Sequence, residues 1–184
     1  MEVIVEEFLM SSPKTRAERP RRTPVAHLGT LEVLDHTHRE IVDMLARMHL
    51  LIEQLEVRGI DESARKLAQD ICRFFDETAR PHHAAEEELI FPDLLNSGDP
   101  ELVQHVQRLQ QDHGWLEEDW FELAPQLRAV ANGQSWYDID VLRSGVPIYT
   151  ELYRDHIALE ETVVYPASRR FLHRNLLRDV PSGK

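Results

Sequence analysis

Two histidine–glutamate pairs have the residue types and the spacing of metal ligands. In each pair the glutamate follows the histidine by four residues: His82 with Glu86, and His156 with Glu160. On a helix this spacing puts the two side chains one turn apart on the same face. The histidine can then bind one metal ion while the carboxylate reaches a second ion beside it. The two pairs therefore predict two bridging carboxylates and two imidazoles of a two-metal site.

Two further histidines, His38 and His113, complete the predicted ligand set, because each interrupts an otherwise apolar helical stripe. Burying unpaired imidazoles and carboxylates is costly, so a core that holds them needs a hydrogen-bond network or a cation. Imidazole and carboxylate suit iron, manganese or zinc, and this chemistry does not choose among the three. The six candidate metal ligands are His38, His82, Glu86, His113, His156 and Glu160.

His36 is the alternative to His38 as the ligand from the first helix. Helical phase favours His38, which follows Leu34 by four residues and precedes Ile41 by three. Four neighbours of the ligands lie away from the centre of the apolar helical stripes: His83, Glu87, Glu88 and Glu161. They are expected to be solvated, or to contact a metal ligand without binding the metal themselves. Among them, Glu87 and Glu161 are the residues expected to orient a ligand imidazole.

Four amphipathic helices are predicted to position these side chains. Apolar residues recur every three or four positions in stretches at about 30–57, 62–96, 100–131 and 136–166, followed by a short C-terminal helix or tail. Asp61 and Asp99 are expected to cap the second and third helices, and Pro125 predicts a kink or local break in the third. Short connections favour an all-α fold, an antiparallel up-down-up-down four-helix bundle over residues 30–184.

The predicted turns place the four histidines at one height. Two residues on antiparallel neighbours lie level when their midpoint falls in the connecting turn. His38 and His82 average to 60, His82 and His113 to 97.5, and His113 and His156 to 134.5, and each value lies within a predicted turn. The imidazoles are therefore expected to form one layer across the bundle.

The remaining composition limits partners and location. Residues 1–29 contain three prolines and a basic cluster, and they predict an irregular N-terminal arm. A net charge of −12 disfavours nucleic acid and anionic lipid as partners. The single cysteine, Cys72, excludes an internal disulfide and fits a reducing compartment. No apolar run is long enough to span a membrane, so a soluble cytoplasmic protein is expected.

The two halves of the chain repeat one another. His38 precedes His113 by 75 residues and His82 precedes His156 by 74. The segment HHAAEEELIFP from His82 aligns with HIALEETVVYP from His156, with a histidine, two successive glutamates and an aromatic–proline pair at identical offsets. A repeated helix pair related by a pseudo-two-fold axis is the physical interpretation.

With these motifs, residues 30 to about 166 resemble the hemerythrin-like, or HHE cation-binding, family. The resemblance implies two iron ions, oxo- or hydroxo-bridged, held by the six candidate ligands. The oxygen carriers of that family use five histidines, whereas four are in phase here, so simple reversible oxygen carriage is not expected. The expected function is binding or sensing of oxygen or nitric oxide. The alternatives are a redox enzyme that removes peroxide or reduces nitric oxide, and a metal-storage or structural site, for which zinc is an option.

Overall fold

The computed structural model describes residues 24–178, and within this range the chain is helical without any strand. The all-α prediction is therefore confirmed for the described residues, and residues 1–23 of the predicted arm lie outside them. Two of the nine segments in this range, η1 and η2, are π-helical. The segments are α1 (Pro24–Arg58), α2 (Glu62–Phe74), η1 (Phe75–Ala79), α3 (Arg80–Leu89), α4 (Phe91–Leu95), α5 (Pro100–Ala131), α6 (Ile139–Leu159), η2 (Glu160–Val164) and α7 (Tyr165–Arg178).

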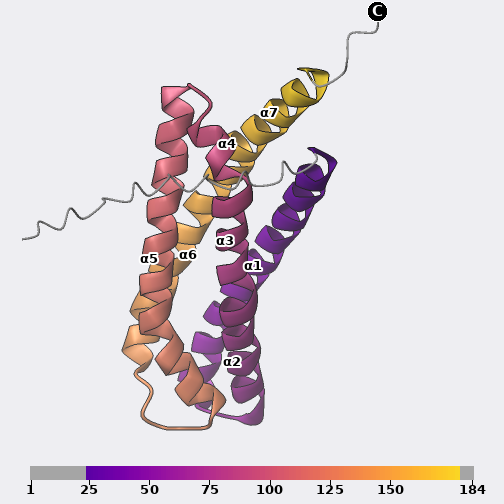
Figure 1. The fold of residues 1–184 in the computed structure, drawn as a ribbon. Helices are drawn as coiled ribbons and strands as arrows, with labels where there is room; N and C mark the ends of the chain where they lie inside the picture. The colour runs from indigo at the N-terminus through magenta and orange to yellow at the C-terminus, as the bar shows by residue number, and fades with distance from the viewer. Residues whose placement is uncertain (1–23, 179–184) are drawn as a thin grey trace, which may run out of the picture.

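The helices pack lengthwise as a bundle (Figure 1). The α1 helix contacts α2 and α6, and α5 contacts the same two helices from the other side. The α2, η1 and α3 segments follow one another along one rod, and α7 extends the line of α6 to pack against α1 and α4. Every long helix thereby presents one side to the interior, where the predicted stripes lie.

Two predicted N-caps are present in the structure. The Asp61 carboxylate accepts a hydrogen bond from the Ala64 backbone N–H at 2.8 Å. The Asp99 carboxylate accepts from the backbone N–H groups of Glu101 and Leu102, and Pro100 occupies the first helical position. These caps satisfy N–H groups that have no partner within the helix. The α5 helix consequently has the predicted bounds.

The first helix begins earlier than predicted. It starts at Pro24, so residues 24–29 belong to α1 and not to an irregular arm. Proline is tolerated in the first turn of a helix because the N–H group that it lacks would have no intrahelical partner there. Pro24 therefore marks the start of this helix, and Pro13 and Pro20 lie outside the described residues.

The second predicted helix, 62–96, is not continuous. It contains the π-helical segment η1, which ends two residues before Pro81, and it breaks at Ile90, two residues before Pro92. A proline inside a helix removes a hydrogen bond and collides with the carbonyl four residues earlier, so the preceding turn must widen or end. Both responses occur in this one stretch.

The fourth predicted helix, 136–166, also differs in its bounds. The α6 helix begins at Ile139 because Asp138 caps it, accepting from the Asp140 backbone N–H at 2.9 Å. It passes into η2, which ends two residues before Pro166, and α7 then continues to Arg178. The predicted short C-terminal helix is therefore present. By contrast, α5 runs through Pro125 without the local break that was one expectation.

The polar layer separates two apolar clusters in the core. One cluster contains Ile41 and Leu116, and the other contains Leu34 and Leu109. His38 lies between Leu34 and Ile41 along α1, and His113 lies between Leu109 and Leu116 along α5. The layer is therefore enclosed by hydrophobic residues at both ends.

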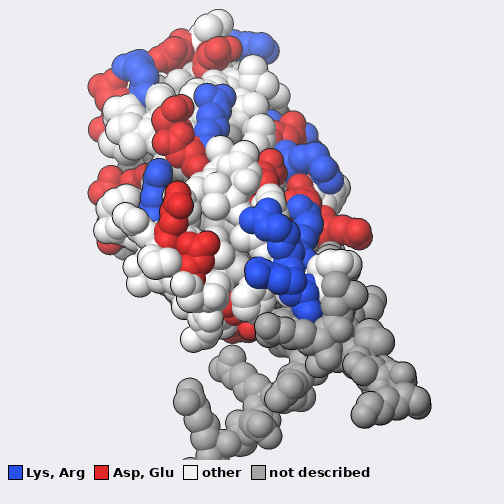
Figure 2. Space-filling view, turned by 90° about the horizontal axis from the view of Figure 1, so that it is seen from above, with Lys and Arg blue, Asp and Glu red and all other residues white. Residues whose placement is uncertain are grey.

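The surface carries charges of both signs. Figure 2 shows acidic and basic side chains interspersed over one end of the bundle, with a group of basic side chains beside the residues drawn in grey. Within the described residues, no helix combines the length and apolar character needed to cross a membrane.

Candidate metal centre

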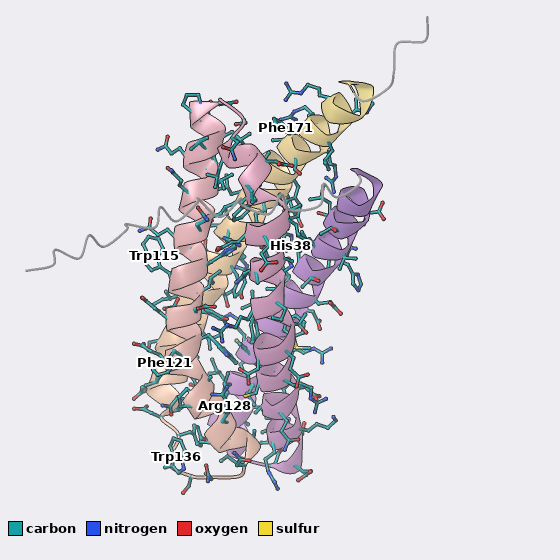
Figure 3. All side chains as sticks on the ribbon, viewed as in Figure 1. His38, Trp115, Phe121, Arg128, Trp136 and Phe171 are labelled. Carbon is teal, nitrogen blue, oxygen red and sulfur yellow. The ribbon has the colours of Figure 1, made fainter. Side chains whose placement is uncertain are left out.

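The structure brings all six predicted ligands together inside the bundle. Their exposed fractions are 5% or less, and Glu86 and Glu160 are fully buried. They form two overlapping groups in which one ligand atom from each residue lies within 4.8 Å of the others. The first group combines the two glutamates with His38 and His82 (position A), and the second combines the same glutamates with His113 and His156 (position B). Figure 3 labels His38, which lies inside the bundle.

Glu160 directs one carboxylate oxygen to each position. Its Oε2 lies 3.1 Å from Nε2 of His38, and its Oε1 lies 3.2 Å from Nε2 of His156. The π-helical turn η2 begins at Glu160 and follows α6, which carries His156. A carboxylate placed in this way can contribute one oxygen to each of two neighbouring cations.

Glu86 has the same arrangement on the opposite pair of helices. Its Oε1 lies 3.3 Å from Nε2 of His82, and its Oε2 lies 3.4 Å from Nε2 of His113. The two glutamates therefore lie between the two positions, each shared by both. This arrangement is the one that the predicted bridging role requires.

The donor atoms of this layer fit a pair of cations. Among the described residues, no hydrogen-bond partner is found for Glu86 Oε2, both oxygens of Glu160, both ring nitrogens of His82 and of His156, and Nε2 of His113. Leaving so many polar atoms buried and unpaired is costly, and a cation satisfies them together. All the donors are imidazole nitrogens or carboxylate oxygens, which are suitable for iron, manganese and zinc.

Without a cation, protonated histidines balance the buried carboxylates. Burial alone lowers the pKa of His38, but the adjacent carboxylates of Glu160 and Glu86 outweigh it and raise that pKa to about 10. Burial is likewise outweighed at His156 by Glu160 and Asp112, which raise its pKa to about 9. Burial lowers the pKa of His82. Two protonated imidazoles thus face two carboxylates, and a metal pair would displace those protons.

A second ring of carboxylates holds the imidazoles from outside. Glu161 contacts Nδ1 of His38 at 3.1 Å, and Glu87 contacts Nδ1 of His113 at 2.8 Å. Both glutamates were expected to orient a ligand imidazole, and the structure shows these contacts. An N–H group that donates to a carboxylate leaves the other ring nitrogen free to face a metal.

Asp112 is a third outer carboxylate, which sequence reasoning missed. Its Oδ2 lies 3.8 Å from Nδ1 of His156, and its side chain is almost completely buried. Asp112 directly precedes His113 in the sequence, so a carboxylate beside a predicted ligand was the available signal. Asp112 on α5 thereby supports a histidine on α6, the other helix of the same half of the chain.

The repeat relates the surroundings of His38 and His113. Tyr165 stacks on His38 with ring centroids 5.4 Å apart, and Phe91 stacks on His113 with centroids 5.7 Å apart; both pairs are inclined by 12°. Glu161 and Glu87 are equivalent in the same way. The pseudo-two-fold symmetry inferred from the sequence therefore extends to residues around the ligands.

Two departures from this symmetry make positions A and B different. Tyr165 carries a hydroxyl that Phe91 lacks, and this hydroxyl donates a hydrogen bond to Glu86 and lies 3.2 Å from Nε2 of His38. His83 in the first half of the chain is equivalent to Ile157 in the second half. Position A therefore has a phenol beside it, whereas position B has an additional imidazole nearby.

His83 is a fifth inward histidine, contrary to the expectation of a solvated side chain. It is 7% exposed, its ring stacks on His113 with centroids 4.2 Å apart, and it forms a three-histidine group with His113 and His156. Burial holds its pKa well below the usual value, so the ring is neutral. Counting four histidines in phase was therefore wrong. The π-helical turn η1 adds a residue to the turn before His83 and shifts the helical phase, which a regular periodicity does not anticipate.

The other histidines with described side chains lie outside the cluster. His36 is 65% exposed at its side chain and faces Glu40, so the structure places His38 and not His36 in the layer. His49 bonds to Thr150 at 3.1 Å, and His105 lies near Glu101 on the outside of α5. Cys72 is buried away from the six residues, and burial raises the pKa of its thiol to about 11.

Comparison with known proteins agrees with this geometry. The hemerythrin HHE cation-binding domain matches residues 29–168, which span all six candidate ligands. The chain is also 27% identical over 150 residues to an uncharacterized protein of Haemophilus influenzae, a match that covers 82% of this chain and 84% of the relative. No solved structure matches the chain. The extent of the domain match shows that the chain belongs to the hemerythrin HHE cation-binding family.

Proposed function

We propose that this protein is a non-haem di-iron protein that binds or senses a diatomic ligand, oxygen or nitric oxide. His38 and His82 would hold the ion at position A, and His113 and His156 the ion at position B. Glu86 and Glu160 would be shared by both. The observation that carries the proposal is that each buried glutamate directs one oxygen to each pair of histidines. The scaffold is proposed to be an up-down-up-down antiparallel four-helix bundle, which explains why the four histidines are level.

Iron is the proposed metal because the resemblance to the hemerythrin family implies it, and a donor set of nitrogen and oxygen without thiolate is compatible with it. When bound, an iron pair supplies an open coordination position and electrons for a diatomic ligand. The chain's own residues keep bulk water out of this layer, since all six ligands are buried. Glu161 and Glu87 hold the imidazole rings of His38 and His113 in one orientation.

A redox enzyme is the second candidate function, and Tyr165 is the observation that favours it. Its hydroxyl is buried at position A, where it donates to Glu86 and lies near His38. Reducing peroxide to water or reducing nitric oxide consumes protons, and a phenol at that place can hold and pass one. The same ligands would serve both functions, so reactivity decides between them.

Exposure of the reduced protein to oxygen tests the proposal. Anaerobically reduced, iron-loaded protein is mixed with oxygen or nitric oxide while the visible absorption is followed. A charge-transfer band that appears and then bleaches reversibly when the gas is removed supports binding or sensing. Rapid irreversible oxidation with consumption of added peroxide supports the enzyme. A colourless protein that retains two zinc ions per chain would refute both and support a structural or storage role.

A further inference from the structure

A surface pocket beside the metal layer has the size and lining of a small-molecule site. Its volume is about 360 Å³, and it lies between η1, α5 and α6. Figure 3 labels two of its residues, Phe121 and Arg128, on α5. A water molecule occupies roughly 30 Å³ in the liquid, so the pocket is far larger than a diatomic ligand requires. Its volume falls within the range of pockets that bind organic molecules.

Five of the residues that line the pocket are aromatic. Phe75, Trp120 and Tyr149 pack on one another, with ring centroids 5.0 Å apart for Phe75 and Trp120 and 5.5 Å apart for Phe75 and Tyr149. Tyr153 adds a fourth ring, and Phe121 lies at the rim with 82% of its surface exposed. Aromatic side chains arranged in this way favour a flat, aromatic occupant.

The charged residues of the pocket neutralise one another. Arg128 bonds to both carboxylate oxygens of Asp76 at 2.8 Å, and Trp120 donates to the same carboxylate at 3.0 Å. Arg80 and Glu117 form a second pair at 3.2 Å. Two arginines against two carboxylates leave no net charge to attract an ion. The lining therefore favours a neutral occupant.

His83 links the pocket to position B. It lines the pocket, and it also belongs to the three-histidine group with His113 and His156. Its Nε2 atom is buried, and no hydrogen-bond partner for it is found among the described residues. An occupant with one hydrogen-bonding group could pair with the His83 imidazole at the inner end of the pocket.

We propose that the pocket binds a small neutral aromatic molecule with a single hydroxyl-type group, its ring against the face formed by Phe75, Trp120 and Tyr149 and its polar group at His83. The proposal deepens the proposed function and rests on it in one respect. If position B holds a metal ion, the polar group of the bound molecule lies beside that ion. A molecule bound there would sit within reach of a metal-bound ligand without displacing any of the six metal ligands.

Calorimetric titration with 2-naphthol, and with naphthalene as the analogue without a hydroxyl, tests the proposal. The purified full chain is expected to bind one 2-naphthol per chain with saturation. Ala124→Phe, which fills the pocket, should weaken binding at least tenfold, whereas Ala46→Phe on the exposed side of α1 should not. Phe121→Ala changes an exposed residue, so it cannot disturb the core, and it should also weaken binding.

His83→Phe tests the polar contact, because it keeps a ring and removes the nitrogen. Its affinity for 2-naphthol should fall about tenfold, as for one lost hydrogen bond, while naphthalene binding is kept. Absence of saturable binding to the wild type, or equal binding by wild type and Ala124→Phe, would overturn the proposal. Metal analysis of the same samples separates the pocket proposal from the di-iron proposal. Binding of 2-naphthol by protein without metal would support the pocket and contradict the di-iron site. Two metal ions per chain without binding of 2-naphthol would support the di-iron site and contradict the pocket.

Discussion

At the scale of single residues, the buried layer is explained by charge balance. Glu86 and Glu160 are fully buried, and such carboxylates require either protonated histidines or cations beside them. The pKa values of His38 and His156 are raised because these carboxylates are adjacent. Metal ions and protons therefore compete for one set of donor atoms. This competition explains why histidines and carboxylates occur together at the centre of an otherwise apolar core.

Replacing His38 separates a ligand from a surface neighbour two residues away. We expect His38→Ala to lose most of its bound metal and to unfold at a lower temperature, since bound metal stabilises the folded chain. His36→Ala should retain the wild-type metal content, because His36 lies on the surface. Metal analysis and thermal unfolding of both variants check this. Equal metal content in the two variants would contradict the assignment.

Tyr165→Phe removes one hydroxyl from position A and leaves the ring. The repeat shows that a phenylalanine fits at the equivalent place, where Phe91 stacks on His113. The lost hydrogen bond to Glu86 should lower the free energy of unfolding by about 1 kcal/mol while the metal is retained. Denaturant unfolding with metal analysis measures both. Loss of the metal in this variant would show that Tyr165 is a ligand rather than a hydrogen-bond donor.

At the scale of elements, the prolines explain both what the sequence predicted and what it missed. Regular periodicity placed His38, Glu86 and Glu160 in the layer, and the turn midpoints predicted that the histidines would be level. It could not anticipate the π-helical turn before Pro81, in which Phe75 and Ala79 are buried.

The same turn explains why His83 was missed. With the phase shifted, His82 and His83 both face inward, although a regular helix would direct only one of them there. Contacts between helices escaped prediction for a related reason. Asp112 approaches His156 on another helix, and Tyr165 approaches Glu86, so neither pairing appears as a spacing within one helix. The expectation against simple reversible oxygen carriage depended on a count of four histidines, and His83 changes that count.

The cap of the second helix provides a test at this scale. Asp61→Ala removes the acceptor for the Ala64 backbone N–H and for Gln54, and it should destabilise the protein by about 1 kcal/mol. Asp61→Asn should restore most of this loss, because asparagine also caps helices well. Denaturant unfolding measures both variants. An unchanged stability in Asp61→Ala would show that the cap contributes nothing to the fold.

At the scale of the whole molecule, the two apolar clusters enclose the layer, so its ionisation is coupled to the stability of the fold. In metal-free protein the pKa values of His38 and His156 are raised to about 10 and about 9, above the 6.5 of an ordinary histidine. The stability that these protonated groups provide is fully present below about pH 6.5, and it is lost as the pH rises through 9 to 10. Metal-free protein should therefore unfold at lower temperature at pH 10 than at pH 7.

Metal-loaded protein is the matched control for this pH dependence. Its donors no longer carry protons, so this contribution to the change between pH 7 and pH 10 should be absent, and metal affinity should rise with pH. Thermal unfolding of both forms at the two pH values gives the comparison. The same decrease in both forms would mean that the histidines of the layer do not control it.

The central claim is that two cations lie side by side between the two shared glutamates. Anomalous diffraction at the iron absorption edge, from crystals of iron-loaded protein, tests it most directly. The account predicts two anomalous peaks per chain, one beside His38 and His82 and the other beside His113 and His156, with Glu86 and Glu160 between them. A single peak, or peaks outside this layer, would contradict it.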